Sequence, residues 1–281
     1  MSLINIEGSS QVVIKLLSMI EKSVGWIVSP KGNQKDFHEG IQIYKESIKN
    51  DQSLSGEEKG ARISTARKDL RQYINQRKII ENSIKDIDEN ADFENIDPDW
   101  LAYFFEYAKN ISNEEIQLVW SKLLANKING NQQMTKKLIH ILSVIEGEDI
   151  DVFCKICSMT FDNVKKEKSK YPFIYIGDFP SYYNSKNIRR YHLHSLADLG
   201  LIEYDIANGF VLPATSPTIK YDGVIYNLSS ENRITTGNIR LTTIGATLLS
   251  MTERIEQDDF IPHCKRVWES LNIQYETIEQ L

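Results

Sequence analysis

Cysteine is scarce in this 281-residue sequence, which contains three. An odd number of cysteines in a chain of this length does not make a disulfide framework, so we expect free thiols. Residues 1–8 lack the basic cluster that leads a secretory signal. The most apolar stretch, 12–28, contains Lys15, Glu21 and Lys22, whereas a membrane-spanning helix needs about 20 mostly apolar residues. We therefore expect a cytoplasmic protein.

A strong excess of charge of one sign is also missing. The sequence has 33 Lys and Arg against 39 Asp and Glu, a formal net charge of −6. Binding to nucleic acid would therefore require a local basic patch, because mild acidity offers no general attraction to phosphates. The hydrophobic fraction of 41% and the charged fraction of 26% are close to globular averages and argue against disorder. This length predicts one large or two modest domains.

Motifs of common enzyme chemistry are absent: we find no Gly-rich phosphate loop, no G-x-S-x-G elbow and no H-E-x-x-H pair. His192 and His194 would lie about 200° apart on a helix and could not easily share a metal or a proton. Cys154 and Cys157 form a C-x-x-C pair that His263-Cys264 could complete as a zinc site. Their apolar helical surroundings instead favour buried thiols, and adjacent ligands chelate poorly. We predict no catalytic residue, cofactor or metal; an enzyme with scattered catalytic residues is the alternative.

The first helix is predicted to run from Ser10 towards Ile27, because apolar residues recur there at steps of three and four. Pro30 and Gly32 end it. Our interpretation is an amphipathic helix packed on the body of the protein or on a second subunit. The alternative is a helix on a membrane surface, with Trp26 at the level of the headgroups. Residues 29–55 are interpreted as a linker with one short helix around 41–48.

A long helix is predicted from Ser55, which forms a capping box with Glu58, to about Asp88, a length of about 50 Å. Apolar residues alternate three and four apart along it, and Arg77 occupies the one heptad position that should be apolar. The pattern is typical of a helix with a partner helix. Another copy of the chain and the protein's own N-terminal helix are equally open as that partner. The apolar residues are Ile63, Ala66, Leu70, Tyr73, Ile80, Ile84 and Ile87.

Residues 97–127 predict two helices with a tight junction. Pro98 suits a first helical turn, and Ser112 with Glu115 reads as a second capping box. Aromatic residues at helical spacing usually form a core rather than a cofactor site. The residues expected to share that core are Trp100, Phe104, Ile116, Trp120 and Leu124.

The remaining sequence mixes helices with strands. Helices are predicted over 134–144, 149–161 and 184–199, the last ended by Gly200, and another from Thr243 towards Glu256. Strand-like segments are 173–176, 218–228 and 239–241. Segments 201–204 and 210–212 flank Asn208-Gly209, which predicts a hairpin between them. The fold class expected is mainly α with a smaller α+β C-terminal part.

A basic stretch lies between residues 164 and 200, with seven Lys and Arg against three Asp and Glu, a local net charge of +4. Tyrosines interleave with these charges, and part of the stretch falls on the helix before the predicted hairpin. The alternative is a solvated face of an interaction domain. The candidate nucleic-acid or partner contacts are Lys165, Lys166, Lys168, Lys186, Arg189 and Arg190.

The run from Asp97-Pro98-Asp99-Trp100 through Phe104-Phe105 and Ser112 to Gln117, with Trp120 and Leu123-Leu124-Ala125, resembles the core motif of an uncharacterised bacterial family, domain of unknown function 2806. Gln76-Arg77-Lys78 and Val24-Gly25-Trp26 upstream, and Leu199–Ile202 and Leu241–Gly245 downstream, extend the resemblance over most of the chain. It implies no known activity. It implies structural roles for Asp99, Trp100, Phe104, Phe105, Ser112, Glu115 and Trp120. The layout is also similar to helical abortive-infection proteins of phage defence.

A helix ending in Leu199-Gly200, followed by a hairpin and then Leu241–Gly245, resembles the latter half of a winged-helix domain. Winged helices bind DNA with the helix before the hairpin, or bind protein. The predicted divisions are 1–54 (amphipathic helix and linker), 55–90 (long helix), 91–163 (helical core), 164–260 (winged-helix-like module) and 261–281 (C-terminal tail).

We expect a non-enzymatic interaction or regulatory protein with a protein partner or self-association and no small-molecule substrate. The phage-defence layout makes an association with phage defence part of this expectation. The alternatives are a defence effector acting at a membrane surface through residues 10–28, and a DNA-binding regulator.

Overall fold

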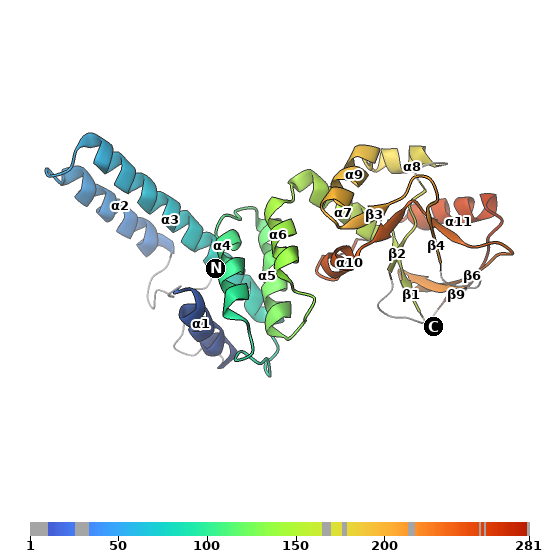
Figure 1. The fold of residues 1–281 in the computed structure, drawn as a ribbon, viewed down its shortest axis with the longest axis horizontal. Helices are drawn as coiled ribbons and strands as arrows, with labels where there is room; N and C mark the ends of the chain where they lie inside the picture. The colour runs from blue at the N-terminus through green and yellow to red at the C-terminus, as the bar shows by residue number, and fades with distance from the viewer. Residues whose placement is uncertain are drawn as a thin grey trace. The chain divides into compact units, whose positions relative to one another are not determined.

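A computed structural model describes residues 11–25, 34–164, 170–175, 179–212, 217–252, 254–255 and 257–279. The chain divides into two compact units, with the boundary between Val144 and Ile145. The predicted boundary at 163 lies further along the chain. The helix predicted over 149–161 consequently begins the second unit instead of closing the first (Figure 1).

The first unit is helical in its described part. Its elements are α1 (Gln11–Val24), α2 (Gln34–Asn50), α3 (Gly56–Ser83) with a 3₁₀ turn (Ile84–Asp86), α4 (Pro98–Ala108), α5 (Glu114–Ile128) and α6 (Lys136–Val144).

Aromatic packing between α4 and α5 forms the centre of this unit, as predicted. The Phe104 ring lies 5.2 Å from those of both Trp100 and Trp120, and all three side chains are buried. Asp97 caps α4 and Pro98 occupies its first turn. The prediction of a second capping box at Ser112 is wrong by one residue. The N-cap of α5 is Asn113, whose side-chain oxygen accepts the amide hydrogen of Ile116.

The long helix begins at the predicted capping box: the Ser55 amide donates to Glu58, and the Glu58 amide donates to the Ser55 hydroxyl. Its apolar side meets α2 first and α5 further along. The interpretation of 29–55 as a linker with one short helix is wrong, since α2 has 17 residues. Arg77, the charged residue in the apolar stripe, forms an ion pair: its guanidinium lies 2.7 Å from the Glu81 carboxylate on the same helix.

Helix α1 packs mainly against α4. Its apolar face is buried there, which leaves little of that face for a membrane surface in this arrangement. Trp26 lies outside the described residues. Among the described helices, none is both long and apolar enough to span a membrane. The buried side chains of α1 are Val13, Leu16, Leu17, Met19 and Ile20.

The second unit combines helices with antiparallel strands. Its helices are α7 (Gly147–Ser158), α8 (Pro180–Ser185), α9 (Arg190–Asp198), α10 (Thr243–Leu249) and α11 (Phe260–Ser270). Its strands are β1 (Thr160–Asn163), β2 (Lys170–Pro172), β3 (Ile202–Tyr204), β4 (Phe210–Val211), β5 (Thr218–Tyr221), β6 (Val224–Ser229), β7 (Thr235–Gly237), β8 (Ile239–Leu241) and β9 (Gln274–Glu279). One sheet has the order β2-β1-β5-β6-β9.

The hairpin predicted at Asn208-Gly209 is wrong. Strand β3 pairs with β8, and β4 pairs with β7, so each predicted arm has its own later partner and the two arms do not pair with each other. The Asp205 carboxylate accepts the amide hydrogens of Ala207 and Asn208, which turns the chain between β3 and β4. A tight hairpin instead joins β5 to β6. Its turn is Asp222-Gly223, where both residues have positive φ.

Three further predictions in this unit need correction. The helix predicted over 184–199 is two helices, because Asn187 has a φ of 60° between α8 and α9. The helix predicted from Thr243 towards Glu256 ends at Leu249. Residues 261–281 are not a tail: they include α11, with Trp268 fully buried, and edge strand β9. The general prediction is confirmed, since a mainly helical chain ends in a smaller α+β part.

Candidate functional site

Helix α9, which carries two of the candidate contact residues, is fixed at its start by His192. The ring Nδ1 accepts the amide hydrogen of Arg189 at 3.2 Å, so Nε2 carries the ring proton and donates to Glu148 Oε1 at 2.8 Å. The side chain of His192 is only 2% exposed. Both ring nitrogen atoms of His192 thus form hydrogen bonds within the fold, and neither has a free lone pair for a metal or for proton transfer.

Acidic residues at the start of α7 lie beside α9. The Ser195 hydroxyl donates to Asp149 at 2.7 Å, and Tyr191 donates to Glu148 at 3.4 Å. The hydrogen bond from His192 is the main cause that lowers the pKa of Glu148. Glu148 therefore stays ionised at neutral pH, and the surface around α9 is mixed in charge rather than uniformly basic.

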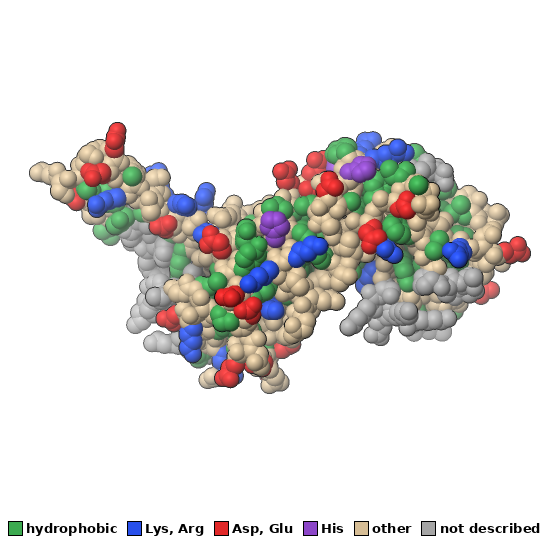
Figure 2. Space-filling model, in the orientation of Figure 1, with side chains coloured by type: hydrophobic (Ala, Val, Ile, Leu, Met, Phe, Trp, Pro, Cys, Tyr) green, Lys and Arg blue, Asp and Glu red, His purple; other side chains and the backbone are tan. Residues whose placement is uncertain are grey.

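The basic corner, defined as Lys186, Arg189 and Arg190, lies at the junction of α8 and α9 (Figure 2). Lys186 Nζ lies 2.8 Å from Asp259 and 3.2 Å from the Gln257 amide oxygen, so its charge is already compensated. Arg189 and Arg190 are exposed and form no ion pair with another described residue. The structure thus leaves two of the three cations available to a partner.

The other candidate contacts, Lys165, Lys166 and Lys168, lie outside the described residues. Lys170, at the edge of the same basic stretch, is bound to Asp162 at 2.6 Å.

The family-motif residues separate into a buried set and an exposed set. The aromatic residues Trp100, Phe104, Phe105 and Trp120 come together in the core of the first unit. Asp99 is exposed at the start of α4, and Ser112 and Glu115 are exposed at the start of α5. Acids in a first helical turn are favoured by the helix dipole and need no chemical role.

A buried pair of amides joins α3 to the α4–α5 junction and was missed by the sequence analysis. The Asn75 side chain donates to the Lys109 carbonyl at 3.0 Å. The Gln117 side chain donates to the Ile111 carbonyl at 2.7 Å and approaches the Asn75 side-chain oxygen at 3.4 Å. Gln117 stood within the recognised motif, but one polar residue in a helix gives no signal of its partner.

The threonine and glycine after β8, Thr242 and Gly245, also have a packing role. The Thr242 hydroxyl donates to the Gly200 carbonyl at 2.7 Å and accepts the amide hydrogen of Gly245 at 3.0 Å. A Cβ atom at Gly245 would collide with the Leu201 carbonyl oxygen. The Leu199–Ile202 and Leu241–Gly245 segments are therefore two sides of one backbone contact.

The thiols and the remaining buried histidine show no sign of chemical activation. Burial raises the pKa of the Cys157 and Cys264 thiols, which keeps them protonated. Burial lowers the pKa of His263 to about 4, and its ring stacks on Tyr182 at 3.8 Å. Across the described part of the chain, no three His, Cys, Asp or Glu side chains are arranged to hold a metal ion.

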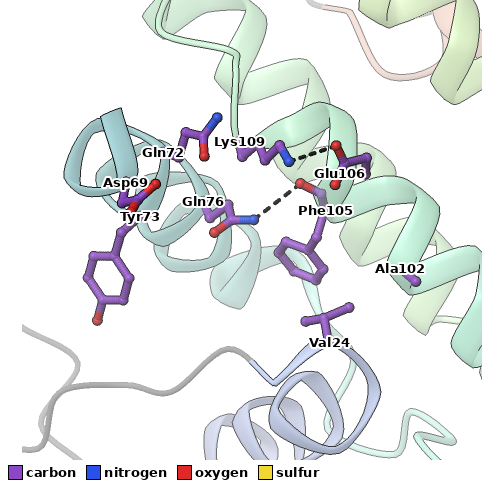
Figure 3. Close-up of a pocket in the computed structure, with 9 residues that line it drawn as sticks. All are labelled: Val24, Asp69, Gln72, Tyr73, Gln76, Ala102, Phe105, Glu106 and Lys109. Carbon is purple, nitrogen blue, oxygen red and sulfur yellow. Dashed lines mark hydrogen bonds and ion pairs between the residues drawn. The ribbon is translucent and has the colours of Figure 1, made fainter. Parts of the chain in front are cut away.

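A cleft of about 490 Å³ is lined by residues of α1, α3 and α4 (Figure 3). Val24 and Phe105 form its apolar side, from α1 and α4. Its polar groups are mostly engaged with one another: Gln76 donates to the Phe105 carbonyl at 3.1 Å, and Lys109 lies 2.6 Å from Glu106. Among the described residues that line the cleft, the one base, Lys109, is already paired with an acid.

A family model described as a protein of unknown function (DUF2806) matches residues 61–265, well over half of the chain. The chain belongs to this family. The match begins within α3 and ends within α11. The DUF2806 segment therefore includes the aromatic core, the amide pair and the Gly200–Gly245 contact, whereas α1 and α2 lie outside it. No curated protein and no solved structure matched the chain.

Proposed function

We propose that this DUF2806 protein is a non-enzymatic interaction protein whose helical arm, defined as α2 and the first half of α3, contacts a second copy of the chain. The observation that carries the proposal is the exposure of two large apolar residues on α2. Ile43 is 68% exposed and Tyr44 is 47% exposed. Isolated exposed apolar residues are common, but two adjacent ones on a projecting helix are typical of a contact surface.

The geometry of α2 supports this use. Ile48 is buried against α3, and Ile43 lies about 140° around the helix from it, at about 100° per residue. Ile43 thus lies on a different side of α2 from Ile48, and Figure 1 shows α2 running alongside α3. Exposed Glu46 lies one turn from Ile43, and exposed Lys49, of opposite charge, lies one turn from Glu46, which limits like-charge repulsion between two copies.

Light scattering of the full chain tests the proposal. We expect twice the 32.4-kDa mass of one chain at about 50 µM, a concentration at which a dimer with a micromolar dissociation constant is mostly assembled. The variant Ile43→Glu/Tyr44→Glu should be monomeric. Val211→Glu, which changes a 48% exposed apolar residue in the second unit, is the matched control and should stay dimeric. A wild-type chain that remains monomeric would refute self-association.

We also propose that α7, α8, α9, β3, β8 and α10 form a winged-helix-like module that binds protein rather than reading DNA. Three observations support protein binding: α9 donates hydrogen bonds to Glu148 and Asp149, Lys186 is compensated by Asp259, and only Arg189 and Arg190 stay unpaired among the described contact residues. Replacing both arginines by glutamine should leave any affinity for duplex DNA nearly unchanged. A loss of more than about tenfold would favour the DNA-binding alternative.

A further inference from the structure

Residues 59–78 of helix α3 carry a larger net positive charge than the basic stretch at 164–200. Between residues 59 and 78 the helix has seven basic residues and one acidic residue, a net charge of +6, in a chain whose total is −6. Lys and Arg side chains are visible along the arm in Figure 2. The basic residues are Lys59, Arg62, Arg67, Lys68, Arg71, Arg77 and Lys78.

Several of these cations already have partners within the chain. Lys59 donates to the Lys49 carbonyl at 2.9 Å, Arg77 pairs with Glu81 and Lys78 pairs with Glu114. The charge of Arg62 acts on Asp51 and Glu58 at the tip of the arm and lowers the pKa of both carboxyls, after hydrogen bonds from Ser53 and Ser55 as the larger causes. These four are accounted for by the fold.

The remaining three, Arg67, Lys68 and Arg71, are exposed and form no ion pair with any other described residue. At about 100° per residue they share an arc of about 100° with Gly60 and Ser64. This arc lies on the side of α3 away from the apolar stripe that meets α2. We define the basic face as these five residues: Gly60, Ser64, Arg67, Lys68 and Arg71.

Gly60 is unexpected inside a helix, because glycine in a helix interior is less favourable than alanine. A Cβ atom at Gly60 would meet nothing within 4 Å, so packing against the described chain does not require glycine here. With Ser64 one turn away, Gly60 leaves the helix backbone open next to the three cations. A bulky, anionic ligand could approach this face more closely than a normal side-chain surface allows.

We infer that the basic face of α3 binds the phosphate backbone of a nucleic-acid duplex. Arginine recognises phosphate in a fixed two-pronged geometry, and a basic row on one side of a helix is the usual electrostatic footprint of nucleic-acid binding. The face contains no aromatic residue on which unpaired bases could stack, which favours a duplex over a single strand. It also has no apolar anchor for insertion into a lipid surface. This inference is independent of self-association, since Ile43 and Tyr44 lie on α2.

Fluorescence anisotropy with the full chain tests it, using a labelled duplex of about 20 base pairs, in DNA and RNA forms, across about 50 to 200 mM salt. The variant Arg67→Gln/Lys68→Gln/Arg71→Gln should bind at least about tenfold more weakly at the low-salt end. Its logarithmic salt slope should fall by about 2.7, because each lost phosphate contact removes about 0.9. The matched control is Lys45→Gln/Arg189→Gln/Arg190→Gln, which removes the same charge elsewhere and should keep most of the affinity and the slope.

A second variant separates binding from folding. Gly60→Leu should raise or maintain the melting temperature, because leucine is a better helix former, while it weakens duplex binding several-fold by covering the open backbone. The inference is overturned if the wild-type chain binds no duplex at low salt, if the control triple variant loses as much affinity as the α3 variant, or if polyglutamate competes as well as unlabelled duplex. Equal affinity for an unpaired strand of the same length would also overturn it.

Discussion

Buried amide groups at single positions hold α3 on the α4–α5 pair. Asn75 is 5% exposed and Gln117 is 1% exposed. Each donates a hydrogen bond to a backbone carbonyl at the junction of α4 and α5, Asn75 to Lys109 and Gln117 to Ile111. Because water cannot replace a lost partner at these positions, such residues matter more for stability than their number suggests.

Replacing Asn75 by alanine should lower the free energy of unfolding by about 1–3 kcal/mol, because the Lys109 carbonyl and the Gln117 amide lose a buried partner. Urea unfolding followed by circular dichroism measures the effect. Gln72→Ala is the matched control on the same helix, since its bond to Asn110 is exposed. We expect the control to change stability by less than about 0.5 kcal/mol. Equal effects of the two variants would show that burial of the amide pair is unimportant.

The start of α5 provides a second test at the residue scale. Asn113→Ala should cost about 1 kcal/mol of unfolding free energy, because the Asn113 side chain accepts the Ile116 amide hydrogen at 3.0 Å. Ser112→Ala should have almost no effect, since Ser112 lies one residue before the cap. Thermal unfolding of both variants distinguishes the two caps, and a larger effect at Ser112 would contradict the observed geometry.

At the scale of elements, the close contact between the start of α10 and the backbone after α9 requires glycine, which has no side chain, at position 245. Gly245→Ala should destabilise the second unit by at least about 2 kcal/mol, because the new Cβ atom meets the Leu201 backbone, which cannot move as a flexible side chain would. Gly147→Ala is the control, since a Cβ atom there meets nothing within 4 Å. Proteolysis of the native protein would report the difference; similar resistance of both variants would contradict the account.

Elements with local signals were predictable from the sequence, and pairings between distant segments were not. The Ser55 capping box and the Trp100–Trp120 pattern depend on residues a few positions apart, which the sequence displays directly. The partner of β3 is β8, more than thirty residues later, and the Asn208-Gly209 signal favoured a nearer partner. Asp222-Gly223 carried an equally good turn signal that was overlooked.

The candidate site shows the same division. Arg189 and Arg190, predicted as candidate contacts, are exposed, but nothing near Lys186 in the sequence indicates that Asp259 compensates its charge. The basic face of α3 was not predicted, because the sequence analysis of this helix followed its apolar stripe alone. Its availability became evident only when α2 was found to cover the apolar side of the same helix.

At the scale of the whole molecule, His263 makes stability depend on pH. Burial is the main cause that lowers its pKa from 6.5 in the unfolded chain to about 4 in the folded one. Below pH 6.5 the His263 ring becomes protonated in the unfolded state, whereas in the folded state it stays neutral until the pH approaches 4. The free energy of unfolding is therefore not reduced by His263 above pH 6.5, and it falls as the pH is lowered from 6.5 towards 4.

Unfolding measured between pH 4 and 7 should show stability falling with a slope of up to about 1.4 kcal/mol per pH unit from this histidine. His263→Gln keeps an N–H donor for the Tyr183 hydroxyl but cannot titrate, so its profile should be flatter over the same range. An unchanged slope in this variant would assign the pH dependence to other groups.

The central claim is that the exposed side of α2 meets α2 of a second copy. Cross-linking tests it most directly: Ser47→Cys places a thiol on α2 near Ile43, and Ser64→Cys places one on the basic face of α3. Under mild oxidation of the full chain, we expect a covalent dimer from Ser47→Cys. The Ser64→Cys variant and the wild type, with its native cysteines, should yield little or none. Equal cross-linking in all three, or none from Ser47→Cys, would contradict the claim.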